Sequence, residues 1–339
     1  MCIRMEVGRM LDRKQYQQLK KEVEPIEKLA LHDDADGITS GVLLSFVLKI
    51  KKVWAPLDFG EWPIKPRKID GEMFYPPDAC VDMVPANPQW PGKLCIDHHP
   101  GHPPEGQRAY KLIWGEVPTS LIIYNLFRDY IPKEHRWKVV CGIVGDGQPE
   151  LIPPEVFKET PQLLENYVTV YEKYGKIELR KFPIYLKLSA PLNAACKIPD
   201  KWYTAYSVLR NATDPIDILE DPALDAARKF VDDEYRRILK ESNAIQLNNG
   251  IRLWKIQSDY KLERTLAFVA EQRDRITTVV VNVKTGRGSI RGTLAQAVFQ
   301  HLQSKGFIAS GHPGYGGLRL KPDQTFRDLY LALRDLKFV

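Results

Sequence analysis

Short apolar runs in the first half of the chain repeatedly end in acidic residues, histidine or proline. The run Ile26–Leu31 is followed by a polar loop and then by the apolar spacing of a helix over 38–50. Two further runs, 79–84 and 94–96, are too short for helices and are typical of strands buried on both faces. This strand–loop–helix rhythm favours a parallel sheet flanked by helices, so we predict an α/β fold.

Two further elements are predicted in the first domain. A helix is expected from Pro118 to about Tyr130, whereas 137–144 is compatible with a strand or a buried helix.

The chain that follows predicts a second, smaller α/β domain. Helical spacing over 222–243 indicates a connector between domains. The elements predicted after it are strands at 250–256 and 276–283 and helices near 294–302 and 324–336. We therefore divide the chain into a front domain (1–220), a linker helix (221–246) and a rear domain (247–339).

Composition excludes several classes of protein. With 339 residues, of which 44% are hydrophobic, the chain can bury a large core and is long enough for two domains. It has no run of about 18 apolar residues, so we expect no membrane-spanning helix, and its first residues lack the apolar stretch of a secretory signal. Five cysteines without a C-x-x-C pair argue against a disulfide framework or a zinc knuckle. We therefore expect a cytoplasmic protein.

Charge is distributed unevenly along the chain. The net charge is +6, but residues 248–339 hold 15 basic and only 7 acidic residues. The remaining residues hold 34 basic and 36 acidic ones. Two interpretations stay open: ordinary solvated surfaces, or a rear domain that binds an anionic partner.

The first acidic segment, at 32–37, reads His-Asp-Asp-Ala-Asp-Gly and lies between a predicted strand and a helix. Ligands bind at the carboxyl ends of strands in open α/β sheets. Three acids within four positions repel one another unless a cation neutralises them. The segment is therefore a candidate metal-binding loop. The plain alternative is an acidic turn in which Asp36 caps the following helix.

Three more segments place acids or imidazoles after apolar runs. Asp82 follows one strand, and its burial would be costly without a partner or a metal. Asp97, His98 and His99 follow the next. Adjacent histidines on an extended backbone point apart, so one can bind a metal while the other faces a substrate, with Asp97 orienting an imidazole. Asp146 ends the run at 142–145.

These side chains together suit two divalent ions. Carboxylates mixed with imidazoles, without cysteine, favour Mn²⁺, with Mg²⁺ as the alternative. Two such ions activate a water and screen the charge of an in-line phosphoryl transition state. Phosphoester hydrolysis is the predicted chemistry.

The combined motifs resemble those of the DHH phosphoesterase superfamily, which is named for the Asp97-His98-His99 triplet. The resemblance implies that His32, Asp34 and Asp82 hold one ion, and that Asp82 bridges to a second. It assigns contact with the scissile phosphate to His99. The set implied for the second ion is Asp36, Asp82, His98 and Asp146.

The rear domain resembles the DHHA1 substrate domain, through Gly-Ser-Ile-Arg-Gly at 288–292 and the glycine-rich segment 309–317. Small residues allow a close approach of the backbone to a phosphate, to which arginine and histidine donate hydrogen bonds. A segment at 192–197 resembles a RecJ motif. The residues implied to bind substrate are Asn193, Ser289, Arg291, Gly311, His312 and Gly317. A simple glycine turn and a loop cap by Asn193 are the plain alternatives.

By motif style and length the chain is most similar to archaeal RecJ-like proteins, in particular the Hef-associated nucleases. The resemblance implies a Mn²⁺-dependent 3′→5′ exonuclease that hydrolyses single-stranded nucleic acid, with DNA favoured, to nucleoside 5′-monophosphates in replication-fork repair. Its implied partners are the single strand and the Hef helicase/nuclease. The resemblance is also compatible with a homo-oligomer. The alternatives are a short-oligonucleotide (nanoRNase) or cyclic-dinucleotide phosphodiesterase, a GINS-associated RecJ-like nuclease, and a Cdc45-like scaffold that has lost metal ligands.

Overall fold

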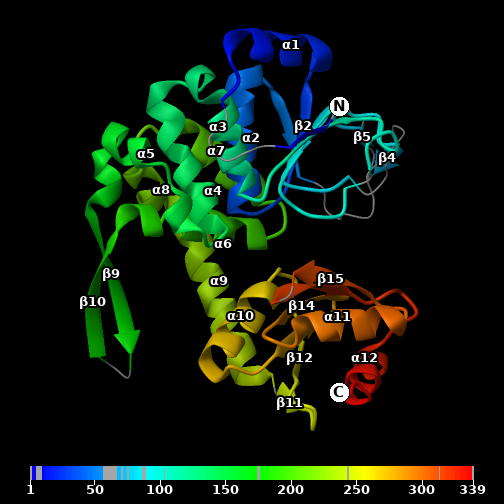
Figure 1. Ribbon diagram of the computed structural model, residues 1–339. Helices are drawn as coiled ribbons and strands as arrows, with labels where there is room; N and C mark the ends of the chain where they lie inside the picture. Colours follow the sequence, from blue (N-terminus) through cyan, green and yellow to red (C-terminus); the bar gives the residue numbers. More distant parts are fainter. Residues whose placement is uncertain are drawn as a thin grey trace. The chain divides into compact units, whose positions relative to one another are not determined.

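The protein, seen in a computed structural model, consists of two compact units (Figure 1). Unit 1 comprises Met1–Cys196 and Asp200–Arg228, and unit 2 comprises Lys197–Pro199 and Lys229–Val339. The structure describes residues 2–4, 10–55, 67–69, 72–74, 76–85, 89–102, 104–173, 176–242, 244–312 and 314–337.

A six-stranded sheet of order β1-β8-β7-β6-β2-β3 forms the centre of unit 1. All of its neighbouring strands are parallel, which confirms the predicted parallel sheet. The three central strands are buried almost completely, as their continuous apolar sequences predict. The strands are β1 Cys2–Arg4, β2 Lys28–Leu31, β3 Lys52–Trp54, β6 Ala79–Val81, β7 Leu94–Asp97 and β8 Lys111–Trp114.

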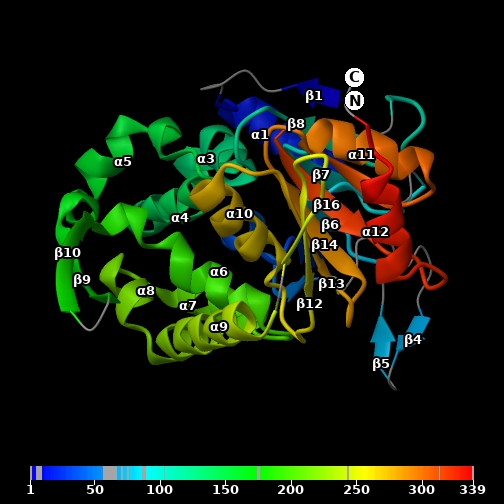
Figure 2. The ribbon, with the colours of Figure 1, turned by 90° about the horizontal axis from the view of Figure 1, so that it is seen from below.

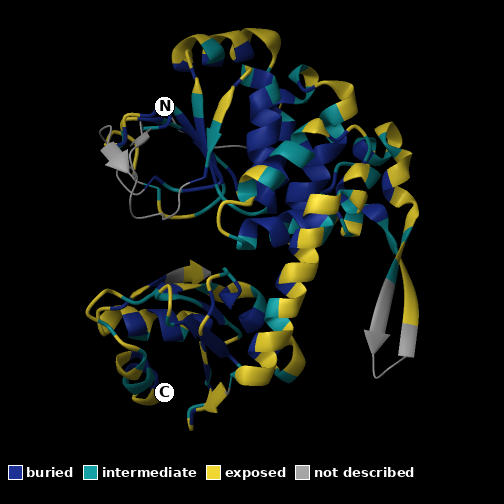
Figure 3. Cartoon of the chain, turned by 180° about the vertical axis from the view of Figure 1, so that it is seen from behind, coloured by how far each residue is buried: buried dark blue, intermediate teal, exposed yellow. Residues whose placement is uncertain are grey.

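Helices pack around α2, which is buried on nearly all sides (Figure 3). It contacts α3, α4 and α7. The ambiguous segment 137–144 forms the end of a 3₁₀ turn and most of α4, so it is a buried helix and not a strand. The helices of this unit are α1 Arg13–Val23, α2 Ala35–Leu48, α3 Thr119–Phe127, α4 Val139–Gly145, α5 Pro154–Glu159, α6 Ser189–Lys197, α7 Trp202–Asn211 and α8 Ile216–Glu220.

Two antiparallel ribbons that the sequence patterns did not predict accompany this sheet. β4 Arg67–Ile69 pairs with β5 Glu72–Phe74, and the longer β9 Asn166–Lys173 pairs with β10 Lys176–Pro183. Neither ribbon contributes to the six-stranded sheet.

The predicted linker is largely helical. α9 spans Pro222–Glu241, and the division between the units falls inside it, after Arg228. The end of the range 221–246 differs from the prediction, because Ala244–Gln246 is strand β11 and pairs with β12 of the second sheet.

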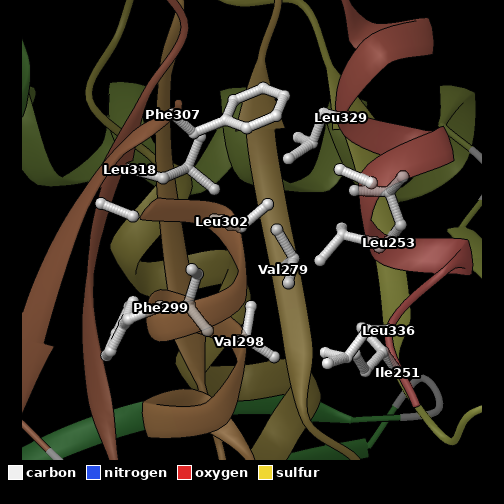
Figure 4. Packing of buried hydrophobic residues seen from close by; sticks show 14 of the residues in the cluster. Ile251, Leu253, Val279, Val298, Phe299, Leu302, Phe307, Leu318, Leu329 and Leu336 are labelled. Atoms are coloured by element: carbon white, nitrogen blue, oxygen red, sulfur yellow. The ribbon is translucent and has the colours of Figure 1, made fainter. Parts of the chain in front are cut away.

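Unit 2 is a mixed sheet of order β11-β12-β13-β14-β16-β15 with helices on both faces. Figure 2 shows α10 on one face and α11 and α12 on the other. The latter face carries a core in which Leu253, Val279 and Phe299 meet Leu329 (Figure 4). The elements are β12 Arg252–Ile256, α10 Glu263–Asp274, β13 Thr278–Asn282, β14 Arg287–Arg291, α11 Ala295–Ser304, β15 Ile308–His312, β16 Tyr315–Arg319 and α12 Phe326–Arg334.

Within the described residues, none of the helices combines the length and the apolar character needed to cross a bilayer.

Lys138 is a buried lysine in the helical layer of unit 1. Its Nζ donates to the carbonyl of Arg210 at 2.8 Å and lies 5.4 Å from the ring centroid of Phe46. Burial lowers the pKa of Lys138 to about 7. Between pH 7 and 10 the unfolded chain therefore binds a proton that the folded chain lacks, so stability rises with pH, by up to ~1.4 kcal/mol per pH unit.

We predict that Lys138→Met removes this dependence. Urea unfolding of the wild type and the variant at pH 7.5 and 9.5 checks it: the wild type should gain stability relative to Lys138→Met at the higher pH. A stability difference that does not change with pH would contradict the prediction.

Candidate metal centre

The candidate site lies at the carboxyl ends of three adjacent strands. His32 follows β2, Asp82 follows β6, and His98 follows β7. Because these strands are neighbours in the order β7-β6-β2, their following residues meet at one edge of the sheet. Asp146 differs from the prediction, since it caps the C-terminus of α4 and does not follow a strand.

One group of candidate ligands comprises His32, Asp34 and Asp82, whose ligand atoms lie within 4.8 Å of one another. His32 Nδ1 lies 2.9 Å from Asp34 Oδ2 and 3.4 Å from Asp82 Oδ2. These are the three residues predicted to hold the first ion. Their convergence is a finding, and their role as ligands stays a prediction.

A second group comprises Asp36, His98 and Asp146, also within 4.8 Å. His98 Nε2 lies 3.4 Å from Asp146 Oδ2 and 3.2 Å from Asp82 Oδ1. Asp82, His98 and His99 form a third such group. Asp82 therefore lies where both predicted ion positions would share a carboxylate.

Asp36 is held by the N-terminus of α3. Its Oδ2 accepts from the backbone N–H of Thr119 at 2.7 Å, and its Oδ1 from that of Ser120 at 3.1 Å. Helix N-termini stabilise negative charge in this way. Burial and the nearby carboxylates of Asp82 and Asp146 nevertheless raise the pKa of Asp36 well above its usual value.

Asp82 adopts a strained backbone conformation. Its φ is +60°, a left-handed value that aspartate tolerates better than most residues. Its side chain is only 1% exposed, and its Oδ1 accepts from Thr119 Oγ1 at 3.1 Å. Strain and a buried carboxylate at one strand end indicate a functional constraint on this residue.

The donor set fits divalent ions. It contains only carboxylate oxygens and imidazole nitrogens, which suit Mn²⁺ and Mg²⁺. The charge balance points the same way. Burial lowers the pKa of His32, but Asp34 and Asp82 outweigh it and raise that pKa to about 10. His98 behaves alike, since Asp82, Asp36 and Asp146 overcome its burial and raise its pKa to about 10. The carboxylates thus draw positive charge to the place where metal ions would bind.

Asp97 lies beside these groups and touches imidazoles instead of joining a candidate ligand group. Its Oδ1 lies 2.8 Å from His99 Nδ1, and its Oδ2 lies 2.8 Å from His102 Nε2. Burial raises the pKa of Asp97, but the hydrogen bonds from His102 and His99 outweigh it and lower that pKa below its usual range. Asp97 therefore contacts two imidazoles, and its predicted role of orienting one of them stays a prediction.

The N-terminus of α2 is capped from two sides. Asp34, and not Asp36, is its N-cap, because Asp34 Oδ1 accepts from Gly37 N at 3.0 Å. Asn193 of α6 accepts from Ala35 N through its Oδ1 at 2.9 Å. Asn193 therefore helps to place the loop that carries His32 and Asp34, while its predicted contact with substrate stays a prediction.

The predicted substrate residues of unit 2 lie together at one end of its sheet. Gly317 of β16 pairs with Ser289 of β14, and Tyr315 pairs with both Arg291 and His312. The Arg291 guanidinium lies 4.6 Å from the ring centroid of Tyr315. Burial, followed by the charge of Arg264, lowers the pKa of Arg291 to about 10. The side chain of His312 lies outside the described part of the structure.

The glycine-rich segment is a hairpin of two strands and not an open loop. Gly311 pairs with Gly316 across this hairpin. A Cβ on Gly311 would lie 2.3 Å from the carbonyl oxygen of Tyr315, so only glycine allows this approach. Most of these glycines therefore lie in paired strands and do not form a simple turn, because the lack of a side chain permits close strand pairing.

Sequence reasoning missed Thr119, Ser120 and Gly142. A Cβ on Gly142 would lie 2.5 Å from Asp36 Oδ1, so α4 can approach Asp36 only because residue 142 is glycine. Pro118 before Thr119 and Ser120 indicates a helix start, but nothing in the sequence shows that this start points at Asp36.

We predict that Asp82→Asn weakens metal binding at least tenfold, because Asp82 belongs to two of the candidate groups. Calorimetric titration with Mn²⁺, and the rise in Tm that Mn²⁺ causes, measure this effect. Asp129→Asn, whose side chain is 65% exposed, is the control and should leave binding unchanged. Equal Mn²⁺ affinity in Asp82→Asn and wild type would refute the assignment.

We predict that Gly142→Ala destabilises the fold by about 1–3 kcal/mol, because the new methyl group would collide with Asp36 and with Ser120 Oγ. It should also weaken Mn²⁺ binding. Denaturant unfolding and metal titration test both effects. Gly314→Ala is the control, since its Cβ would meet nothing within 4 Å. Two equally stable variants would contradict the prediction.

Comparison of the sequence with models of known protein families finds no match, and neither does comparison with curated proteins. Solved structures do match. A structure of CDC45 from Entamoeba histolytica has a TM-score of 0.55 at 8% identity and covers 98% of this chain and 99% of its own. RecJ from Thermus thermophilus in complex with Mn²⁺ has a TM-score of 0.60 at 14% identity, covering 95% of this chain and 54% of its own.

A third structure, exonuclease RecJ bound to manganese, has a TM-score of 0.57 at 14% identity and covers 95% of this chain and 93% of its own. This chain therefore spans about half the length of the T. thermophilus protein and nearly all of the other two. At these identities the likeness establishes the fold. The chain has the two-unit α/β fold that RecJ and CDC45 share.

Proposed function

We propose that the chain is a metal-dependent phosphodiesterase of the DHH superfamily that removes nucleotides from single-stranded nucleic acid. The observation that carries the proposal is Asp82, a buried carboxylate between two groups of candidate ligands, with His99 beside it. The predicted motifs and the manganese-bound RecJ structures of the same fold support it.

In this proposal the residues of unit 1 hold the metal ions and contact the scissile phosphate. Two divalent ions held there would activate a water and screen the charge of the phosphoryl transition state. His99 is the most exposed of the three imidazoles in these groups, at 38% of its side chain. As an imidazolium with its Nδ1–H on Asp97, it would donate from Nε2–H to a phosphate oxygen. Water adds to phosphorus while the bond to the 3′ oxygen of the remaining strand breaks, which releases a nucleoside 5′-monophosphate.

Unit 2 supplies binding in this proposal. Its residues 248–339 carry the excess of basic side chains, and Ser289, Arg291 and Gly317 lie together on neighbouring strands. A basic surface that follows a phosphate backbone binds strands without sequence preference, and its affinity falls steeply with salt. The proposal has four further parts, which rest on the resemblance. They are the 3′→5′ direction, the preference for DNA, a Hef-like partner and a role in fork repair.

A CDC45-like scaffold is the second candidate, because the E. histolytica structure matches almost the whole chain. The filled ligand positions favour hydrolysis: a scaffold has no need to gather four carboxylates, two of them buried, and three imidazoles into overlapping groups of ligand atoms.

The test is product analysis on single strands of about 20 nucleotides, labelled at the 5′ or the 3′ end, with Mn²⁺, Mg²⁺ or chelator. We predict mononucleotide release from the 3′ end with Mn²⁺, and a loss of at least 100-fold in Asp82→Asn. A dinucleotide substrate that is hydrolysed faster than the long strand would favour the short-oligonucleotide alternative. Release from the 5′ end would favour a GINS-associated type, and no hydrolysis would favour the scaffold.

A further inference from the structure

A second imidazole contacts the carboxylate of Asp97 from outside the candidate ligand groups. His102 Nε2 lies 2.8 Å from Asp97 Oδ2. The other oxygen, Oδ1, lies 2.8 Å from His99 Nδ1 and accepts from the backbone N–H of His98, also at 2.8 Å. Asp97 is fully buried and the side chain of His102 is 6% exposed. The carboxylate is thus held between two imidazoles and a backbone amide.

Tyr110 determines which nitrogen of His102 carries the proton. Its hydroxyl lies 3.3 Å from His102 Nδ1. Burial raises the pKa of Tyr110, so the phenol keeps its proton and donates it to this contact. His102 then accepts at Nδ1 and donates from Nε2 to Asp97. This arrangement satisfies both nitrogens of a buried imidazole.

The same chain of contacts determines which ring nitrogen of His99 faces the site. Because Asp97 Oδ1 accepts from Nδ1–H of His99, the nitrogen left for the site is Nε2. The carbonyl of His99 accepts from Trp114 Nε1 at 2.9 Å, which holds the backbone of the same residue. Ring and backbone are therefore fixed by different partners.

We propose that His102 is a positioning residue that holds the carboxylate of Asp97 and through it keeps the Nδ1–H of His99 on Asp97, so that Nε2 of His99 is the nitrogen directed to the substrate phosphate. Without His102, one oxygen of a buried carboxylate loses its donor, and the carboxylate is free to turn away from His99. The consequence for catalysis rests on the proposed hydrolase function, whereas the tautomer of His99 is a property of the chain itself.

The first test measures that tautomer by NMR of the full chain labelled with ¹⁵N-histidine, which gives seven histidines to assign. Spectra of the metal-free and the Mg²⁺-loaded protein are recorded up to a pH at which His99 is neutral. The wild type should show His99 protonated at Nδ1, and His102→Phe a mixture of both tautomers. A wild-type His99 protonated at Nε2, or an unchanged tautomer in His102→Phe, would overturn the proposal.

The second test is kinetic. His102→Phe should lower kcat about 10- to 100-fold with KM within about twofold, because the substrate site itself is untouched. His102→Gln, whose amide N–H replaces Nε2–H, should restore most of the rate. Tyr110→Phe keeps the contact to Asp97 and should cost less than His102→Phe. Equal losses in the Gln and Phe variants, at equal Tm, would show a merely structural role.

The outcomes separate the two proposals. If the wild type hydrolyses no strand with any metal, the proposed function fails, while the NMR measurement still decides the role of His102. If His102→Phe does not fold, the wild-type tautomer and the His102→Gln variant decide it.

Discussion

The mutual repulsion of buried carboxylates is the constraint on which the rest of unit 1 depends. Asp36 and Asp82 are almost completely buried, and each lies close to a further acid. Such groups cannot all be charged in a poorly solvated place without positive partners. Imidazoles, backbone amides and, in our proposal, divalent ions are those partners.

The ends of helices in unit 1 hold and position these acidic side chains. The N-terminus of α3 holds Asp36, and the N-terminus of α2 is capped by Asp34 and by Asn193 of a distant helix. The C-terminus of α4 delivers Asp146. Glycine at position 142 allows α4 to approach closely enough for this. Helix packing and ligand placement are therefore one problem, because moving any of these helices would separate the ligand groups.

Beside the candidate ligand groups, Tyr110, His102 and Asp97 form a chain of side-chain hydrogen bonds. The hydroxyl of Tyr110 contacts the imidazole of His102, and that imidazole contacts one oxygen of Asp97. The other oxygen of Asp97 contacts His99. Such a chain of hydrogen bonds fixes protons on particular nitrogens. This explains physically how the exposed His99 can take a role different from that of its neighbour His98, although the two are adjacent in sequence.

The sequence by itself predicted the parallel sheet of unit 1, because short apolar runs that end in acids or histidines are typical of buried strands in an α/β sheet. Its motifs also indicated the candidate ligands that the structure brings together, although Asp146 follows a helix and not a strand. It also indicated the helical connector. Only the tertiary structure decided that 137–144 is a helix, that Asp34 rather than Asp36 is the cap, and that the glycines at 311 and 317 lie in strands. It alone revealed Thr119, Ser120 and Gly142 around Asp36, and His102 behind Asp97. The physical reason is that periodicity and spacing report which face of an element is buried, whereas the partners of a buried polar group are chosen by elements distant in the chain.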